Sequence, residues 1–238
     1  MDLIEQNKQS YNKIAELFSS TRGYVWGDIS FLAKNIKDGD NILDLGCGNG
    51  RLVESLQVKG ESISYLGIDN SEGLIKQAQK SYPDQKFEVC DVLDIGDCEL
   101  GIKKFDVIIM VSSLNHFPKD NQQSVIENVK RLLKPGGKLL MVNWNLWNRD
   151  NLKSIWKNVS LAMILFGERG VTTHWKTTGV DVPLYYYAFT KGRIKRLLQK
   201  NGFTVTKNYY SAKNDPDRPG KKSSWLRGLN IVTVAKLK

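Results

Sequence analysis

A short apolar segment that runs directly into a glycine-rich loop is the feature that most constrains how this chain can fold. Residues 41–45 have the length and composition of a buried strand, and residues 46–50 follow with glycine at every second position. A helix is predicted over 51–56. Glycines permit positive φ angles and let the backbone approach a ligand closely. The pattern therefore indicates a binding loop at the carboxyl end of a strand.

Four further predicted strands follow, separated by helical segments. The predicted strands are 64–68, 86–90, 105–111 and 138–143, and the clearest helices between them are 71–80 and 121–133. The segment 105–111 is almost wholly apolar, which is typical of a strand covered on both faces. Strands that alternate with helices predict an α/β fold with a doubly wound, mostly parallel sheet.

The flanking regions complete a single domain over residues 1–238. Short helices are predicted at 11–18 and 28–35, a longer one at 151–166, a β-rich stretch at 171–188, a helix at 192–200, and strands at 203–210 and 231–237. We expect a helical N-terminal cap (1–37), a ligand-binding core (38–143), an inserted cap (144–189) and a C-terminal helix with the last two strands (190–238). The inserted cap would cover the carboxyl edge of the sheet, where open α/β sheets bind ligands.

The composition excludes several classes of protein. The longest apolar run, 161–166, is far shorter than the roughly 20 residues that cross a bilayer, and no signal-type N-terminus is present, so no membrane association is expected. The cysteines Cys47, Cys90 and Cys98 are odd in number and lack C-x-x-C spacing. They predict reduced thiols in a cytoplasmic protein rather than a disulfide framework or a metal site.

The net charge of +10 is unevenly distributed along the chain. Residues 1–118 contain 12 Lys/Arg and 18 Asp/Glu, whereas residues 119–238 contain 23 Lys/Arg and 7 Asp/Glu. A basic half attached to an acidic half indicates a polyanionic substrate such as nucleic acid. A generally solubilising basic surface remains the alternative.

Carboxylates stand at the ends of three successive predicted strands: Asp44, Asp69 and Asp91. Asp69 is placed to accept the hydroxyls of a ribose, Asp91 to accept an adenine amino proton with Val92 as an apolar wall, and Asp44 to hold an α-amino group. A nicotinamide-binding loop would read G-x-G-x-x-G and would hold a pyrophosphate, which Asp44 would repel. Solvated strand ends beside a tight turn are the remaining alternative.

Residues 42–50 resemble the first motif of class I S-adenosylmethionine-dependent methyltransferases, and 67–69, 90–92 and 132–139 resemble later motifs of that superfamily. The resemblance covers about residues 38–143. It implies a Rossmann-like, seven-stranded sheet with an antiparallel last strand, and S-adenosylmethionine as cofactor with S-adenosylhomocysteine as product. The candidate cofactor-binding residues are Tyr11, Arg22, Asp44, Gly46, Cys47, Gly48, Asn49, Gly50, Asp69, Asn70, Asp91, Val92, Val111 and Ser112.

The flanks resemble a narrower family, the tRNA wobble-uridine methyltransferases that esterify 5-carboxymethyluridine. The similar segments are 11–22 with Trp26, 69–75, 111–117, and 185–192 with 201–203. Asn115 departs from the family, which usually carries a His-His pair at 115–116. The resemblance implies tRNA as the substrate. It also raises the question of a small activator protein, for which the sequence shows no surface.

Candidate catalytic residues are His116 and Arg22. A carboxylate acceptor is already nucleophilic at neutral pH, so the enzyme need only position it, and Arg22, His116, Trp144 or Tyr187 could bind it. An amine or phenol acceptor would instead require a base, for which His116 is the obvious candidate. The alternatives are a packing role for His116, and for Arg22 and Trp26 a role in pinning the N-terminal helix.

Further candidate substrate contacts are Trp26, Asn115, Trp144, Tyr187, Lys221, Lys222 and Arg227. The run 185–187 could stack on bases while Arg193, Lys195 and Arg196 contact phosphates, or it could be a strand with buried rings. The basic loop 212–228 could clamp RNA or be an ordinary solvated loop. An RNA methyltransferase is therefore predicted, with a small-molecule methyltransferase and a non-catalytic RNA-binding or activator subunit as rivals.

Overall fold

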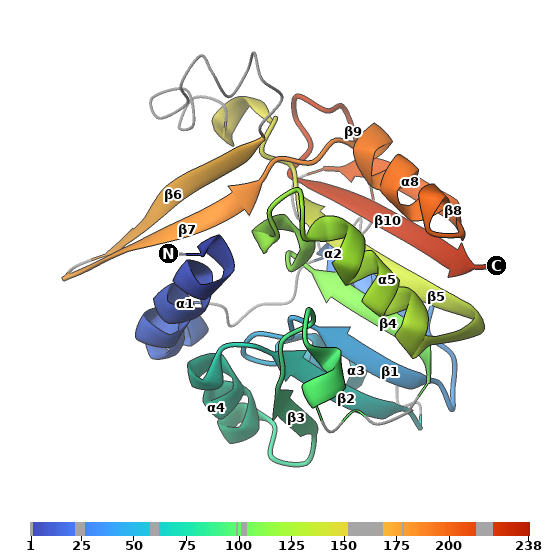
Figure 1. Cartoon of the computed structure of the whole chain (residues 1–238), viewed down its shortest axis with the longest axis horizontal. Helices are drawn as coiled ribbons and strands as arrows, with labels where there is room; N and C mark the ends of the chain where they lie inside the picture. Colours follow the sequence, from blue (N-terminus) through green and yellow to red (C-terminus); the bar gives the residue numbers. More distant parts are fainter. Residues whose placement is uncertain are drawn as a thin grey trace.

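The computed structural model describes residues 2–21, 27–57, 62–98, 100, 104–151, 169–177, 179–212 and 221–238 (Figure 1). The helices are α1 (Leu3–Ser20), α2 (Gly27–Ala33), α3 (Leu52–Gln57), α4 (Glu72–Ser81), α5 (Gln122–Leu132) and α8 (Lys191–Lys200). Single 3-10 turns are η1 (Ile95–Asp97) and η2 (Leu114–His116). The strands are β1 (Asn41–Leu45), β2 (Ser64–Asp69), β3 (Lys86–Val89), β4 (Phe105–Val111), β5 (Leu133–Trp144), β6 (Gly170–Thr177), β7 (Val180–Tyr187), β8 (Phe203–Ser211), β9 (Lys222–Ser223) and β10 (Asn230–Leu237).

In the described part of the chain, the main sheet has the order β3-β2-β1-β4-β5-β10-β8-β9. The pairs from β3 through β5 are parallel, and β10 runs antiparallel to both β5 and β8. The prediction of a doubly wound, mostly parallel sheet with an antiparallel last strand is therefore confirmed. The expected seven strands become eight because β9, only two residues long, pairs with the end of β8.

Helices cover both faces of the main sheet because side chains alternate along its strands. In β4, Ile108 and Met110 pack with the apolar side chains of α5 and α8, whereas Val107 and Ile109 pack with those of α2, α3 and α4. All four β4 side chains are buried. Two covered faces explain the nearly continuous apolar composition of this strand.

Helix α1 is longer than the predicted 11–18 because it begins at Leu3, where the Asp2 side chain accepts a hydrogen bond from the Ile4 backbone N–H. Its first turns do not look amphipathic because two polar residues, Asn7 and Ser10, are buried. Both bond to the β7 backbone, at Tyr185 and Pro183. Although α1 is the longest described helix, no helix among the described residues is long and apolar enough to cross a membrane.

Strands β6 and β7 form a separate antiparallel hairpin that extends beside α1 (Figure 1). Helix α1 packs against β7 on one side and against α4 on the other. The predicted β-rich stretch 171–188 thus becomes a hairpin, while most of the helix predicted over 151–166 lies outside the described residues. The hairpin joins the main sheet through Trp144 and Tyr186, whose rings stack with centroids 5.3 Å apart.

Candidate functional site

A pocket lies at the carboxyl ends of β1, β2, β3 and β4 and is closed on one side by α1. Strands β1 and β4 are neighbours from which the chain proceeds in opposite directions across the sheet, so this is the switch point at which α/β sheets bind ligands. The predicted site residues that line it are Tyr11, Asp44, Gly46, Cys47, Gly48, Asn49, Asp69, Asn70, Asp91, Val92, Val111, Ser112 and His116. Residues from six separate segments of the chain therefore meet in this pocket.

The glycine loop connects β1 to α3 and forms one wall of the pocket. Gly46 has a φ of 76°, and a Cβ added there would collide with the Ser113 side chain. Gly48 has a φ of 57°, and a Cβ added there would meet nothing within 4 Å. Packing thus requires glycine at Gly46, whereas at Gly48 the backbone borders open space. That second position suits the close approach of a ligand.

Asp44 lies at the base of the pocket and is only 2% exposed. Burial, with a smaller contribution from the nearby Asp69, raises the pKa of its carboxyl to about 7. The Tyr65 hydroxyl opposes this shift by donating a 2.9 Å hydrogen bond to one carboxylate oxygen. A buried carboxylate with a raised pKa is stabilised by a neighbouring cation, so this part of the pocket favours a positively charged ligand.

Asp69 ends β2 with its carboxylate held by two backbone groups. Gly48 N–H donates to one oxygen and Ser71 N–H to the other, each at 2.9 Å. Burial nevertheless raises the pKa of the Asp69 carboxyl, and Asp91 contributes in the same direction. Each carboxylate oxygen can accept a further hydrogen bond besides the one from the backbone. The carboxylate can therefore bind a pair of hydroxyl groups.

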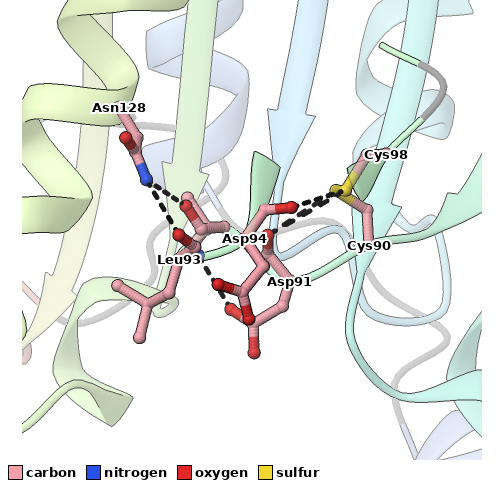
Figure 2. Close-up of a disulfide and its surroundings, with 7 residues drawn as sticks. Cys90, Asp91, Leu93, Asp94, Cys98 and Asn128 are labelled. Carbon is pink, nitrogen blue, oxygen red and sulfur yellow. Dashed lines mark hydrogen bonds between the residues drawn. A yellow bond between two sulfur atoms is a disulfide. The ribbon is translucent and has the colours of Figure 1, made fainter. Parts of the chain in front are cut away.

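Asp91 and Val92 follow β3 in a turn closed by a disulfide between Cys90 and Cys98 (Figure 2). The Asp91 carboxylate accepts a 2.8 Å bond from Leu93 N–H. The prediction of reduced thiols is therefore wrong for this pair, since η1 folds the chain back and brings the two Cα atoms within 5.7 Å. Cys47 is the free cysteine, and burial raises the pKa of its thiol well above the usual range.

Val111 and Ser112 close the pocket at the end of β4. Ser112 is the one described non-glycine residue with a positive φ, 57°. Its buried hydroxyl has no hydrogen-bond partner among the described residues. A strained backbone and an unsatisfied polar atom cost free energy, and in a pocket they mark a contact for a ligand.

His116 is held between the hairpin and α1. Its Nδ1 lies 3.0 Å from the Tyr185 carbonyl oxygen and 3.2 Å from the Asn7 side-chain nitrogen, and because the carbonyl is the nearer group and can only accept, we place the proton on Nδ1. Nε2 then accepts from the Tyr11 hydroxyl at 3.1 Å. Burial lowers the pKa of His116 to about 4. The imidazole is therefore neutral at physiological pH and orients the phenol of Tyr11.

Other predicted site residues lie outside the pocket lining. Asn115 is fully buried, and its side chain bonds to the Trp144 N–H and the Tyr187 carbonyl, joining β5 to β7. Gly50 packs below the loop against the Phe87 ring, and Trp144 stacks on Tyr186. These residues support the walls of the site.

The aromatic run at the end of β7 does not offer its faces to solvent. Tyr185, Tyr186 and Tyr187 are 7%, 6% and 2% exposed. Tyr187 packs on Phe189 and beneath the guanidinium of Arg193, which lies 5.1 Å from its ring centroid. Of the two alternatives for this run, the structure therefore supports the strand with buried rings rather than base stacking, and burial extends to both sides of the strand.

The predicted basic substrate residues lie away from the pocket. Lys221, Lys222 and Arg227 are exposed near the start of β10. Arg22 and Trp26 lie outside the described residues.

Among the pocket residues that sequence reasoning missed are Ile4, Asn7 and Phe18. All three belong to α1, whose apolar pattern is interrupted by buried polar groups. Asn7 stands four residues before Tyr11, on the same helix face, and its side chain bonds to both the N–H and the carbonyl of Tyr185. The spacing from Tyr11 was a usable signal, but the partner strand was not visible in the sequence.

Comparison with known families gives one match to a family model, described as a methyltransferase domain, over residues 36–202. This match spans more than half of the chain.

Among curated proteins, the chain is similar to the tRNA (carboxymethyluridine(34)-5-O)-methyltransferase of Schizosaccharomyces pombe, with 25% identity over 219 residues that cover 87% of this chain and 92% of that protein. The Mus musculus enzyme of the same name is 30% identical over 57% of this chain, but the match covers only 19% of that longer protein. A ubiquinone biosynthesis O-methyltransferase of Coxiella burnetii is 35% identical over 45% of this chain and 44% of its own length.

Two solved structures share the fold. A methyltransferase from Methanosarcina mazei superposes with a TM-score of 0.67 at 22% identity, covering 87% of this chain and 96% of that one. A Haloferax volcanii methyltransferase, solved in complex with the Trm112 methyltransferase activator, also gives 0.67 at 16% identity, covering 97% and 96%.

Proposed function

The chain belongs to the methyltransferase-domain family and is an S-adenosylmethionine-dependent methyltransferase, and from that premise we propose that its methyl acceptor is RNA. The specific acceptor that we propose is the carboxylate of 5-carboxymethyluridine at the wobble position of tRNA, which would become a methyl ester. The observation that carries this proposal is the similarity to the fission-yeast enzyme over nearly the full length of both chains.

The pocket fits S-adenosylmethionine in charge and shape. The ligand carries a sulfonium and an α-amino group, and the pocket gathers Asp44, Asp69 and Asp91 around open space beside Gly48. We assign Asp44 to the amino group, Asp69 to the ribose hydroxyls and Asp91 with Val92 to the adenine. The unpartnered Ser112 hydroxyl is a further contact for the polar part of the ligand.

The bound cofactor supplies an electrophilic methyl group on sulfur. A carboxylate acceptor carries no proton that must leave, so this chain needs no general base. That agrees with His116, whose Nε2 is already engaged by Tyr11 and whose pKa of about 4 keeps it neutral. We assign His116 and Tyr11 to positioning, a contribution that in favourable cases reaches several kcal/mol.

Residues outside the pocket support a macromolecular acceptor. The 23 Lys/Arg and 7 Asp/Glu of residues 119–238 give that half a strongly positive charge, which favours a polyanion. We propose that the β6–β7 hairpin and α1 act as a cap over the acceptor, because the hairpin is fixed to both α1 and the end of β5.

The test is transfer of labelled methyl groups from S-adenosylmethionine to bulk tRNA, followed by nucleoside analysis. The substrate tRNA comes from cells that lack their own wobble-uridine methyltransferase, so that unmodified acceptors are present. The expected product is a base-labile methyl ester on a uridine nucleoside. An Asp69→Ala variant serves as the inactive control. Repeating the assay with a Trm112-type activator tests whether a partner is required, since a structural relative from Haloferax volcanii forms a complex with that activator.

A small-molecule acceptor is the second candidate, supported by similarity to the Coxiella burnetii O-methyltransferase. That similarity covers less than half of the chain, whereas the tRNA-enzyme similarity also includes the basic C-terminal part. A sample that binds S-adenosylmethionine by calorimetry but neither binds nor methylates tRNA would favour the small-molecule alternative.

A further inference from the structure

A turn near the start of β10 holds an aromatic ring out in solvent. Trp225 is 53% exposed, and it is the one aromatic among the large hydrophobic side chains that are exposed in the described residues. Tryptophan is usually well buried in folded proteins, so a half-exposed ring indicates an unused contact surface.

The backbone of this turn is fixed although the ring is free. The fully buried Asn145 donates through its side-chain amide to the carbonyls of Trp225 and Gly228, both at 2.7 Å. Asn145 N–H also donates to the Leu229 carbonyl, and Arg149 N–H to the Leu226 carbonyl. Because its backbone is already fixed, the turn that carries Trp225 loses little conformational entropy when a ligand binds. Such pre-organisation favours binding.

The turn lies on the same edge of the sheet as the pocket. Asn230, the first residue of β10, pairs with Trp144, the last residue of β5, and β4 is the next strand after β5. Three strand spacings separate β1 from β10, which is about 14 Å. A single-stranded polymer with one unit beside the cofactor pocket can therefore reach Trp225 along the sheet edge.

The surroundings of the ring are positively charged. The segment from 221 to 229 carries Lys221, Lys222 and Arg227 and no acidic residue. All three cations are exposed. An accessible aromatic face beside several cations is the combination with which proteins hold single-stranded nucleic acid, the ring stacking on a base and the cations contacting phosphates.

We propose that Trp225 is a base-stacking platform for single-stranded RNA, with Lys221, Lys222 and Arg227 contacting the adjacent phosphates. The proposal rests on the proposed RNA acceptor and adds a second contact point outside the pocket. Base–aromatic stacking of the usual strength corresponds to a change of about 5- to 140-fold in Kd.

The experiment measures binding of a fluorescent oligouridylate, and separately of bulk tRNA, by anisotropy. Trp225→Ala should weaken binding of both within the range above without changing the salt dependence, and Trp225→Phe should restore most of the affinity. Leu226→Ala is the matched control, because Leu226 is 39% exposed in the same turn but offers no ring. Calorimetric binding of S-adenosylmethionine confirms that each variant is folded.

Two outcomes overturn the proposal. Wild-type affinity in Trp225→Ala shows that the ring does not contact RNA, and equal losses in Trp225→Ala and Leu226→Ala indicate an apolar docking patch for a protein. Failure of the proposed function has a different signature. If oligouridylate binding depends on Trp225 but no tRNA is methylated, the stacking role of Trp225 is supported and the proposed tRNA acceptor is wrong. If the wild type binds no RNA, the stacking role and the proposed acceptor are both wrong.

Discussion

At the scale of single residues, several side chains of the pocket lower the stability of the empty protein and are suited to a bound ligand. Asp44, Ser112 and His116 are each held in an environment that opposes their preferred state: a buried carboxylate, an unpartnered hydroxyl on a strained backbone, and an imidazole whose pKa is depressed by burial. Such costs persist in folded proteins where a ligand relieves them. The sequence identified all three positions as candidate site residues, but it did not reveal that each one lowers the folding stability of the empty protein.

Asp44→Asn should make the empty protein more stable at neutral and alkaline pH. The folded pKa of about 7 exceeds the unfolded value, so the wild type loses stability as pH rises from about 4 to about 7 and then levels off. Removing the charge removes that loss, which is at most on the order of 4 kcal/mol at ~pH 8.

Thermal unfolding at about pH 5 and about pH 8 measures this effect, and the variant's advantage should be larger at the higher pH. The same variant should bind S-adenosylmethionine more weakly, since its amide cannot neutralise an ammonium group. A variant that is no more stable than the wild type at the higher pH would show that Asp44 is ionised without penalty.

Asn7→Ala should destabilise the protein by about 2–3 kcal/mol, because it leaves the buried N–H of Tyr185 without its acceptor and its carbonyl with one donor fewer. Gln9→Ala is the control on the same helix, since among the described residues the Gln9 side chain bonds only to exposed Glu5, and its loss should cost under about 0.5 kcal/mol. Urea unfolding of the two variants provides the comparison. Equal effects would mean that Asn7 does not tie α1 to β7.

At the scale of elements, the sequence predicted the parallel core well and its attachments poorly. Strands β1 and β4 are largely apolar runs buried on both faces, so each could be recognised alone. Helix α1 and the β6–β7 hairpin depend on each other through Asn7 and Ser10, and long-range partners of polar residues leave no periodic signal. The disulfide likewise needed η1 to bring its cysteines together.

Breaking the Cys90–Cys98 bond should loosen the turn that carries Asp91. The bond closes a loop with a sequence separation of 8, which corresponds to a stabilisation of about 2–3 kcal/mol. Cys98→Ser should therefore lower the melting temperature of the oxidised protein, and a reductant should lower the wild type to the same value. The reductant should leave the variant unchanged. A wild type that is insensitive to reductant, with both thiols titrating freely, would contradict the bond.

At the scale of the whole molecule, one half of the chain carries the donor site and the other carries the positive charge. The acidic carboxylates around Gly48 suit a cationic cofactor, while Lys221, Lys222 and Arg227 of the basic half lie near the start of β10, at the same sheet edge. The donor could be inferred from a few local motifs because its chemistry is fixed. The acceptor could not, because the surface that we propose for it is assembled from segments far apart in the sequence.

This division predicts that tRNA affinity depends on salt through the basic half alone. Replacing Lys221, Lys222 and Arg227 together by Ala should reduce the slope of log Kd against log salt by about 2–3, since each phosphate contact contributes about 0.7–0.9. The control replaces Lys34, Lys76 and Lys80, which are equally exposed but lie on or beside α2 and α4. Both triple variants remove the same net charge, so a long-range field would lower the two slopes alike. A loss confined to the first set instead identifies direct contacts at the edge that carries Trp225. Equal slopes in all three proteins would show that RNA does not reach this edge, and the basic half would then serve only to attract it.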